Sequence, residues 1–202
     1  MERTAVIGSG VMGAGIAAHL ANAGVQVDLL DIVPEGAEDR DILARGAITR
    51  LHKAKPAPLM HADFAERIRP GNLEDHLERV AEVGWIVEAV IEDLKIKQKV
   101  FKKLEKIRKD GSFISSNTST IPRAQLTKGM GRRFERDFLI THFFNPPRYL
   151  RLLEIVPSPV MELERLNAFR DFTDRRLGKG VVICNDTPGF IGNRIGVYWM
   201  QC

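Results

Sequence analysis

The sequence predicts an α/β protein with a doubly wound, mostly parallel sheet, and three observations indicate that fold. A glycine-rich turn comes directly after the first apolar segment, at residues 8–13. A near-continuous apolar run at residues 85–91 is typical of a strand that is buried on both faces of a parallel sheet. Short apolar segments alternate with helical ones, which is the pattern of parallel strands joined by crossover helices.

The predicted strands and helices follow one another without an internal repeat or a low-complexity tract. Residues 34–70 are polar and mostly helical in character, and the Pro-rich residues 55–58 interrupt them. Apolar segments predict strands at residues 4–7, 25–30, 85–91, 113–116, 138–143, 152–156 and 181–184. Helical patterns predict helices after Gly13 and over residues 41–53, 95–107, 159–177 and 190–200.

The length and composition fit one well-buried domain and the beginning of another, since the chain has 202 residues of which 44% are hydrophobic. Residues 190–200 start a strongly apolar helix that needs something more to pack against. We therefore expect residues 1–186 to form one domain, and residues 187–202 to begin a mostly helical second domain of a longer protein. The alternative is that this helix docks on its own sheet or on a second copy of the chain.

The net charge of +4 includes a concentrated basic run at residues 95–106. We interpret this run as the solvated face of a helix that buries Ile96, Val100, Leu104 and Ile107. Nucleic-acid binding is the alternative, and the lack of interleaved aromatic side chains argues against it.

Cysteine content and hydropathy exclude other classes of protein. The cysteines are Cys184 and Cys202, without a C-x-x-C spacing or a nearby histidine cluster, so neither a disulfide framework nor a metal site is predicted. The N-terminus lacks the pattern of a signal sequence, and no apolar run is long enough to cross a bilayer. We therefore expect a soluble, cytoplasmic protein without a membrane span.

The first strand, turn and helix predict a dinucleotide-binding site of the Rossmann type. Gly8 permits the turn, Gly10 leaves room for a pyrophosphate against the backbone, and Gly13 lets the helix pack on the strand. The acid after the second strand can accept hydrogen bonds from a ribose and would repel a 2'-phosphate, which favours NAD over NADP. The predicted cofactor-binding residues of this region are Gly8, Gly10, Val11, Met12, Gly13 and Asp31.

Three polar groups fall toward the ends of later predicted strands, where ligands bind in open α/β sheets. They are residues 116–119, His142 and Glu154. A histidine can accept a hydroxyl proton near neutral pH, and a carboxylate partner would orient it and stabilise the imidazolium that forms. From the residues alone, a core histidine whose hydrogen bonds are satisfied is the favoured interpretation of His142.

The chain resembles the NAD-binding domain of the L-3-hydroxyacyl-CoA dehydrogenases of fatty-acid β-oxidation, and the resemblance spans essentially all of it. The motifs that carry it are GSGVMG at residues 8–13, EAVIE at 88–92, SNTS at 116–119, HFFNP at 142–146 and DTPGFIGNR at 186–194. The resemblance implies NAD as the cofactor and oxidation of a (S)-3-hydroxyacyl-CoA to a 3-oxoacyl-CoA.

The same resemblance implies roles for individual residues. His142 would be the catalytic base and Glu154 its charged partner. Ser119 would hydrogen-bond the substrate's C3 oxygen and approach the nicotinamide, and Asn193 would complete the polar surround of the reacting carbon.

Further residues match positions of the family that contact cofactor or substrate. Glu92 and Lys97 would contact the ribose on the nicotinamide side and the phosphates, and Asn145 would lie near the nicotinamide. Lys53 and Lys55 are candidates for binding the phosphates of coenzyme A, in a loosely matching segment.

Two segments depart from the short mitochondrial-type enzymes, namely residues 55–58 and 147–153. They look more like the large bacterial and archaeal proteins that join this dehydrogenase to an enoyl-CoA hydratase. In the family a helical C-terminal domain follows and supplies the dimer interface, so we expect a homodimer formed through such a domain.

Two other functions remain open from the sequence. One is a related oxidoreductase acting on 3-hydroxybutyryl-CoA alone or on a sugar acid. The other is a non-catalytic NAD-binding protein.

Overall fold

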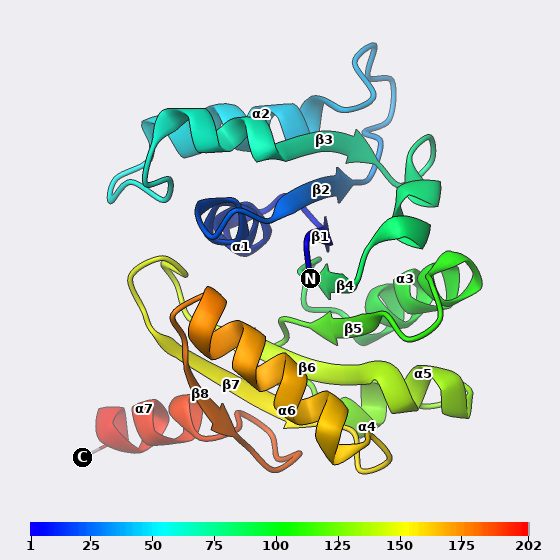
Figure 1. The fold of residues 1–202 in the computed structure, drawn as a ribbon, viewed down its shortest axis with the longest axis vertical. Coiled ribbons are helices and arrows are strands. Elements are labelled where there is room, and N and C mark those ends of the chain that lie inside the picture. Colours follow the sequence, from blue (N-terminus) through cyan, green and yellow to red (C-terminus); the bar gives the residue numbers. More distant parts are fainter. Residues whose placement is uncertain (202) are drawn as a thin grey trace.

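The computed structural model describes residues 1–201 as one sheet of eight short strands with helices packed against it (Figure 1). The strands are β1 (Arg3–Ile7), β2 (Gln26–Asp31), β3 (Ile68–Asn72), β4 (Trp85–Glu88), β5 (Phe113–Ser116), β6 (Phe138–Phe143), β7 (Leu152–Pro157) and β8 (Gly180–Ile183). The α-helices are α1 (Val11–Asn22), α2 (Ile42–Lys53), α3 (Leu94–Ile107), α4 (Arg123–Leu126), α5 (Arg132–Asp137), α6 (Leu163–Asp171) and α7 (Gly192–Gln201). Two 3₁₀ helices, η1 (Ala62–Arg67) and η2 (Leu77–Glu82), and a π-helical turn, η3 (Phe172–Arg176), complete the elements.

The strand order is β3-β2-β1-β4-β5-β6-β7-β8, with β3 and β8 at opposite ends of the sheet (Figure 1). Every neighbouring pair is parallel except β6 and β7, which run antiparallel. The strand order changes direction at β1. β2 and β3, which follow β1 in the sequence, lie on one side of it, and β4 to β8 lie on the other side. Ligands bind at such a switch point in doubly wound sheets, so the predicted fold class is confirmed and the switch point lies beside the glycine turn.

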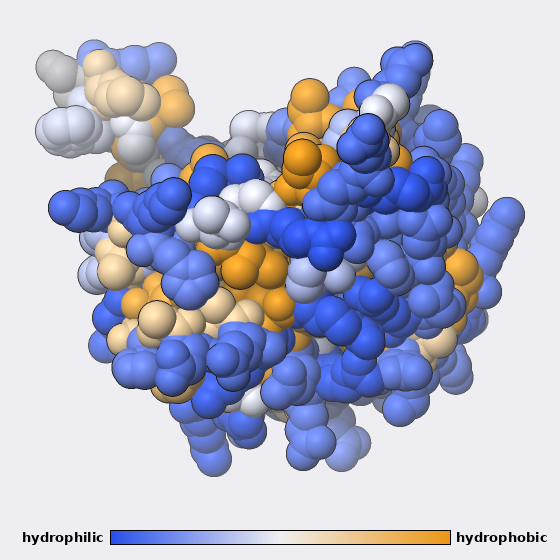
Figure 2. Space-filling view, turned by 90° about the horizontal axis from the view of Figure 1, so that it is seen from above, coloured by the Kyte–Doolittle hydropathy of each residue, from blue (hydrophilic) through white to orange (hydrophobic). Residues whose placement is uncertain are grey.

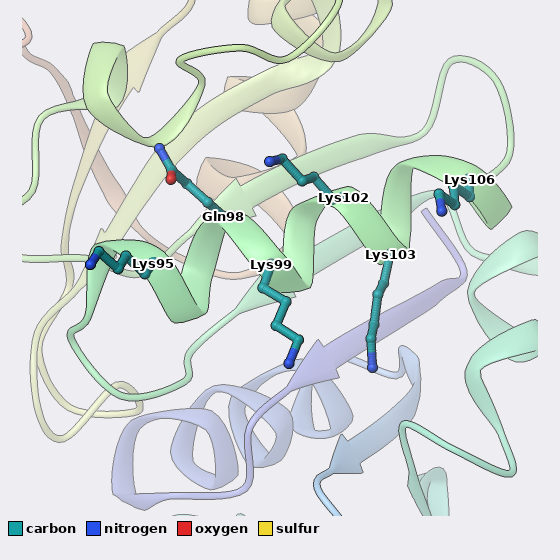
Figure 3. Close-up of a pocket in the computed structure, with 6 residues that line it drawn as sticks. All are labelled: Lys95, Gln98, Lys99, Lys102, Lys103 and Lys106. Atoms are coloured by element: carbon teal, nitrogen blue, oxygen red, sulfur yellow. The ribbon is translucent and has the colours of Figure 1, made fainter.

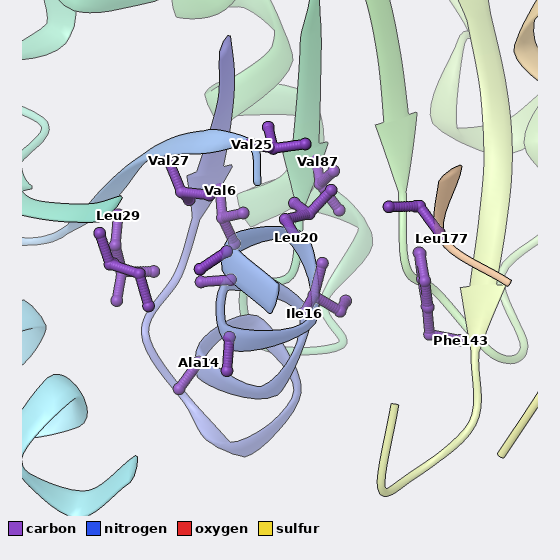
Figure 4. Packing of buried hydrophobic residues seen from close by; sticks show 14 of the residues in the cluster. Val6, Ala14, Ile16, Leu20, Val25, Val27, Leu29, Val87, Phe143 and Leu177 are labelled. Atoms are coloured by element: carbon purple, nitrogen blue, oxygen red, sulfur yellow. The ribbon is translucent and has the colours of Figure 1, made fainter. Parts of the chain in front are cut away.

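Apolar side chains form two buried clusters on opposite faces of the sheet. Successive residues of a strand point to opposite faces, and Val6 belongs to one cluster while Ala5 and Ile7 belong to the other. Figure 4 shows the first cluster, in which Ala14, Ile16 and Leu20 of α1 lie against Val6, Val27, Leu29 and Val87 of the sheet. Small side chains on α1 therefore bring this helix close to the centre of the sheet.

Two parts of the predicted strand pattern need correction. The strand β3 was missed because Ile68–Asn72 contains Pro70 and Gly71, which weaken a strand pattern. Proline is tolerated there because β3 is an edge strand that pairs with β2 alone. The strand predicted over residues 85–91 ends at Glu88, and the exposed Ile91 belongs to the loop that follows. The helix predicted over residues 159–177 is α6 followed by η3.

The predicted buried stripe of α3 needs correction in part: Leu104 is buried and Val100 packs against the core as predicted, but Ile96 does not. The buried residues of α3 are Lys97, Phe101 and Leu104, whereas Ile96 is 44% exposed. The helix is turned by about one residue from the predicted orientation. It buries Phe101 and places Lys97 against the buried carboxylate of Glu88.

The opposite face of α3 carries the basic run. Lys99 and Lys103 are exposed, and their side chains extend to one side of the helix (Figure 3). A shallow depression there is lined by Lys95, Gln98, Lys99, Lys102, Lys103 and Lys106. Within residues 1–201 none of these lysines makes an ion pair, so the face is a solvated one.

The helix α7 projects beside β8 at the end of the sheet (Figure 1). None of its residues is buried, and Trp199 is 78% exposed. Most of the surface seen in Figure 2 is hydrophilic, with apolar side chains gathered in smaller patches. No described helix is both long and apolar enough to span a membrane.

His19 of α1 is buried and lies 3.0 Å, through Nε2, from the carbonyl oxygen of Leu177. Burial, together with the charge of Lys179, lowers the pKa of His19 from 6.5 to about 4. Between those values the unfolded chain binds a proton that the folded chain does not, so stability from neutral His19 is present above pH 6.5 and lost toward pH 4.

We therefore expect the wild type to lose about 2 kcal/mol more unfolding free energy than His19→Gln between pH 7 and pH 5. The glutamine side chain keeps a hydrogen-bond donor for the carbonyl oxygen of Leu177 but does not titrate. Urea unfolding at the two pH values measures the difference. Equal losses in the two proteins would contradict the assignment.

Candidate active site

Most of the predicted site residues meet at the carboxyl ends of β1, β4, β5 and β6. A cavity of about 520 Å³ opens there. Its lining includes the predicted residues Gly10, Val11, Met12, Glu92, Lys97, Ser119, His142 and Asn145. The parallel strands bring these residues together although they are up to 135 positions apart in the sequence.

The glycine turn has the geometry of a phosphate cradle. A Cβ at Gly13 would lie 1.8 Å from the carbonyl oxygen of Gly8, so only glycine allows this approach of α1 to the turn. Gly8 has φ +98°, and a Cβ there would lie 2.7 Å from the oxygen of Ala89. A Cβ at Gly10 would meet nothing within 4 Å, which leaves the space in front of the helix open. The first turn of α1 has neither a side-chain cap nor an acidic residue, so its N–H groups are free for a phosphate.

Asp31 lies at the end of β2, next to this turn. Its carboxylate accepts hydrogen bonds from the backbone N–H of Ser9 at 2.6 Å and from that of Ile32 at 2.7 Å, and the Ser9 hydroxyl also donates to it. These bonds fix the carboxylate beside Gly10, where ribose hydroxyls can reach it. Ser9 was not among the predicted residues, although its position between two glycines of the fingerprint could have indicated a role in the glycine turn.

Glu92 and Lys97 belong to a charge cluster behind the cavity. The Lys97 ammonium lies 2.7 Å from Glu88 and 3.1 Å from Glu92, and its side chain is 1% exposed. Burial would raise the pKa of Glu92, but the hydrogen bond from Thr118 and the charge of Lys97 outweigh it and lower that pKa. Lys97 therefore borders the cavity with its charge committed to two carboxylates, and Glu92 is the more exposed partner.

Glu88 is a site residue that the sequence analysis did not single out. It is fully buried and accepts hydrogen bonds from Lys97, from the Ser116 hydroxyl at 2.6 Å and from the Val90 backbone at 2.7 Å. The sequence feature that could have pointed to Glu88 is that it is the lone acid in the otherwise apolar run at residues 85–91.

His142 and Glu154 face each other across the antiparallel pair of β6 and β7. The Nδ1 atom of His142 lies 2.7 Å from Oε2 of Glu154, and both side chains are buried. Directly opposed residues of antiparallel strands bring their side chains together, which explains how positions twelve apart form this pair. Nδ1 of His142 is used by Glu154, and His142 also lines the cavity, so its Nε2 atom is the ring nitrogen that a ligand could contact.

The other oxygen of Glu154 is held by the start of α7. Oε1 accepts hydrogen bonds from the backbone N–H of Ile191 at 3.0 Å and from that of Gly192 at 2.7 Å. The Cys184 thiol lies 3.8 Å from the same oxygen, and burial and the Glu154 charge raise its pKa to about 11, so it is a neutral donor. Each oxygen of the Glu154 carboxylate thus has a hydrogen-bond partner, and Oε1 lies at the N-terminal end of α7.

The remaining polar residues surround the space in front of His142. Ser119 is half-buried and lines the cavity, and its backbone carbonyl accepts a hydrogen bond from the Asn193 amide at 3.1 Å. The amide oxygen of Asn117 accepts from the backbone of Phe143 at 3.0 Å and fixes the end of β6. Asn117 was predicted only as part of the SNTS motif, whereas the structure shows that it supports the strand that carries His142.

A second hollow, a groove of about 530 Å³, adjoins the cavity. Gly10, Val11 and Asn145 line both. Arg50 and Lys55 line the groove, and its lining includes no acidic residue. Lys53, the last residue of α2, is exposed and does not line it.

No group of three or more His, Cys, Asp or Glu side chains within residues 1–201 is placed to share a metal ion. The residues of the glycine turn and Asp31 instead fit a dinucleotide, since the Cβ distances show a backbone cradle open at Gly10.

Comparison with known proteins agrees with this geometry. The family model described as 3-hydroxyacyl-CoA dehydrogenase, NAD binding domain, matches residues 3–187. A Deinococcus radiodurans protein named "Probable 3-hydroxyacyl-CoA dehydrogenase" is 49% identical over 198 residues, which cover 98% of this chain and 57% of that protein. A Bacillus subtilis protein of the same name is 48% identical over 212 residues, which cover 98% of this chain and 27% of the relative.

A solved structure shows the same fold. The crystal structure of FadB2 from M. tuberculosis superimposes with a TM-score of 0.82 at 30% sequence identity, covering 99% of this chain and 69% of that one. This chain spans 57% of the Deinococcus relative and 27% of the Bacillus relative. The chain belongs to the 3-hydroxyacyl-CoA dehydrogenase family and carries the family's NAD-binding domain.

Proposed function

We propose that the protein oxidises (S)-3-hydroxyacyl-CoA to 3-oxoacyl-CoA with NAD, as in fatty-acid β-oxidation, and that His142 and Glu154 form its catalytic dyad. The observation that carries the proposal is the buried pair of these residues, 2.7 Å apart, in a cavity that also borders the glycine turn. NAD, when bound, accepts the hydride that leaves C3 of the substrate.

His142 is the base for the hydroxyl proton. A hydrogen bond from Nδ1–H to Glu154 leaves Nε2 unprotonated, so Nε2 can take the proton as the C3–O bond becomes a carbonyl. Glu154 then stabilises the imidazolium that forms. Its own charge is held by the backbone N–H groups of Ile191 and Gly192, so the dyad does not depend on solvent for its negative partner.

Ser119 and Asn193 orient the substrate in this proposal. Ser119 lines the cavity together with His142, and its hydroxyl is the donor for the C3 oxygen. Asn193 is held against the Ser119 backbone, which places its amide at the same end of the cavity.

The groove is the proposed place for the coenzyme A part of the substrate. Arg50 and Lys55 supply positive charge for phosphate groups, and apolar residues such as Leu51 and Pro58 supply walls for the rest of the arm. Of the two lysines expected to bind coenzyme A, Lys55 has support from this geometry.

The division of the chain is also a proposal. We infer that residues 1–186 act as the NAD-binding domain and that residues 187–202 belong to a second, helical unit that takes part in dimerisation. The exposed apolar side chains of α7, among them Tyr198 and Trp199, support this division.

The proposed reaction is tested by following the absorbance of NADH with acetoacetyl-CoA as the oxidant. The product of the complete reading frame and residues 1–202 are assayed in parallel. Turnover that requires the coenzyme A thioester supports the proposal. Oxidation of free hydroxy acids without coenzyme A would favour a sugar-acid oxidoreductase, and NADH binding without turnover of any hydroxyacyl substrate would favour a non-catalytic role.

A further inference from the structure

The outer wall of the groove is tied to the turn that follows His142. Arg148 donates hydrogen bonds through Nη1 to the carbonyl oxygens of Ala57 at 2.6 Å and Leu59 at 2.9 Å. The Tyr149 hydroxyl donates to the Ala57 oxygen as well, at 2.9 Å. Residues 55–58 and 147–153, the two segments that set this chain apart in the sequence, thus contact each other about 90 residues apart.

The inner end of this segment is attached to α1 and the core. The Asn22 amide donates to the Pro58 oxygen at 2.9 Å and accepts from the Met60 backbone N–H at 2.8 Å, and Leu59 is buried. Lys55, Pro56 and Ala57 are exposed, and the charge-assisted bonds from Arg148 hold this outer part through the Ala57 oxygen.

The turn that carries Arg148 is itself held by contacts on two sides. Lys179, whose side chain is buried, donates to the carbonyl oxygens of Leu150, at 2.9 Å, and of Pro147. Burial lowers the pKa of Lys179 to about 8. On the other side Pro147 packs on α1, where a Cβ at Gly15 would lie 3.0 Å from its ring. Arg148 therefore extends from a turn that is held both by the segment before β8 and by α1.

We propose that Arg148 is a positioning residue for the substrate: it holds residues 55–59 as the wall of the groove, so that the wall and the dyad keep a fixed separation. This inference rests on the proposed function. The groove and the catalytic cavity share Asn145, which lies between His142 and Arg148 in the same turn. Arg148 affects the binding of the coenzyme A part of the substrate through the groove wall, whereas His142 acts at the reacting carbon.

The test compares two thioesters that share the reacting group. Acetoacetyl-CoA carries the whole arm, and acetoacetyl-N-acetylcysteamine lacks the nucleotide and most of the arm. In the complete protein, Arg148→Met is expected to raise the KM for acetoacetyl-CoA about tenfold, with kcat and the Kd of NADH changed by less than about twofold. For the short thioester, kcat/KM is expected to match the wild type, because that substrate does not reach the wall.

Two further variants serve as a control and as a milder change at the same contact. Arg151→Met is the matched control, because Arg151 lies in the same segment and, within residues 1–201, its side chain donates only to the Gly178 oxygen, at 3.3 Å. It is expected to behave as the wild type with both thioesters. Tyr149→Phe removes one hydroxyl from the same contact and is expected to raise the KM for acetoacetyl-CoA about twofold to threefold, without the risk of misfolding that a buried change carries.

The inference and the proposed function fail in different ways. An active wild type with an unchanged KM in Arg148→Met would overturn the inference alone, and so would an equal loss with both thioesters. A wild type that turns over neither thioester would overturn the proposed function and the inference with it.

Discussion

Replacing His142 by glutamine is expected to lower kcat for acetoacetyl-CoA reduction at least about a thousandfold, while the Kd of NADH stays within about twofold of the wild type. Glutamine cannot take up or deliver a proton at neutral pH, so the base is lost. The residues that fit the adenosine and pyrophosphate, Gly10 and Asp31, lie at the ends of other strands and are untouched. Steady-state kinetics and fluorescence titration with NADH measure the two quantities.

The matched control for this change is His52→Gln, since His52 is exposed on α2 and makes no contact with the cavity. It is expected to keep the wild-type rate. A His142→Gln protein that retains more than about a tenth of the wild-type kcat would show that another group is the base.

Replacing Glu154 by glutamine is expected to lower kcat by about three to four orders of magnitude, nearly as much as the loss of the base. The backbone N–H groups of Ile191 and Gly192 require an acceptor, so they select the amide oxygen of the new side chain. Its NH₂ group then faces Nδ1 of His142, which must accept, and the ring proton moves to Nε2. A histidine in that tautomer cannot take the substrate's proton in the oxidation. In acetoacetyl-CoA reduction, the imidazolium that must deliver the proton loses its counter-charge.

The control is Glu164→Gln, because Glu164 is exposed on α6, away from the cavity. The KM for acetoacetyl-CoA in Glu154→Gln is expected to stay close to that of the wild type, since the change acts on proton transfer. A wild-type kcat in Glu154→Gln would rule out the dyad.

Much of the fold could be predicted because short strands at β1, β5 and β6 are marked by local apolar patterns. The edge strand β3 could not, because pairing along one side tolerates Pro70 and needs no continuous apolar run. The orientation of α3 was wrong for a different reason. The amphipathic pattern assumes that Lys97 faces water, and only the tertiary structure shows the buried carboxylate of Glu88 that takes it inward.

In the candidate site, too, some residues could be predicted from the sequence and others could not. Spacing and residue type predicted the glycine turn and Asp31, whereas they only suggested the pairing of His142 with Glu154, which the family resemblance implied. The donors that hold the second oxygen of Glu154 are backbone groups of Ile191 and Gly192, which leave no mark in residue type. The contact of Arg148 with residues 57 and 59 likewise depends on a long-range approach that no local pattern encodes.

In the proposed mechanism, the attachment of Glu154 to the start of α7 links the reaction rate to a folding equilibrium. An isolated helix of ten residues is only marginally stable in water, and none of the side chains of α7 is buried within residues 1–201. Whenever its first turn frays, Oε1 of Glu154 loses two hydrogen-bond donors at once, and the proposed dyad loses the backbone groups that hold its carboxylate in place. The observed kcat is then the intrinsic rate multiplied by the fraction of molecules in which this turn is formed. Anything that covers the outer face of α7 raises that fraction and activates the site without touching it.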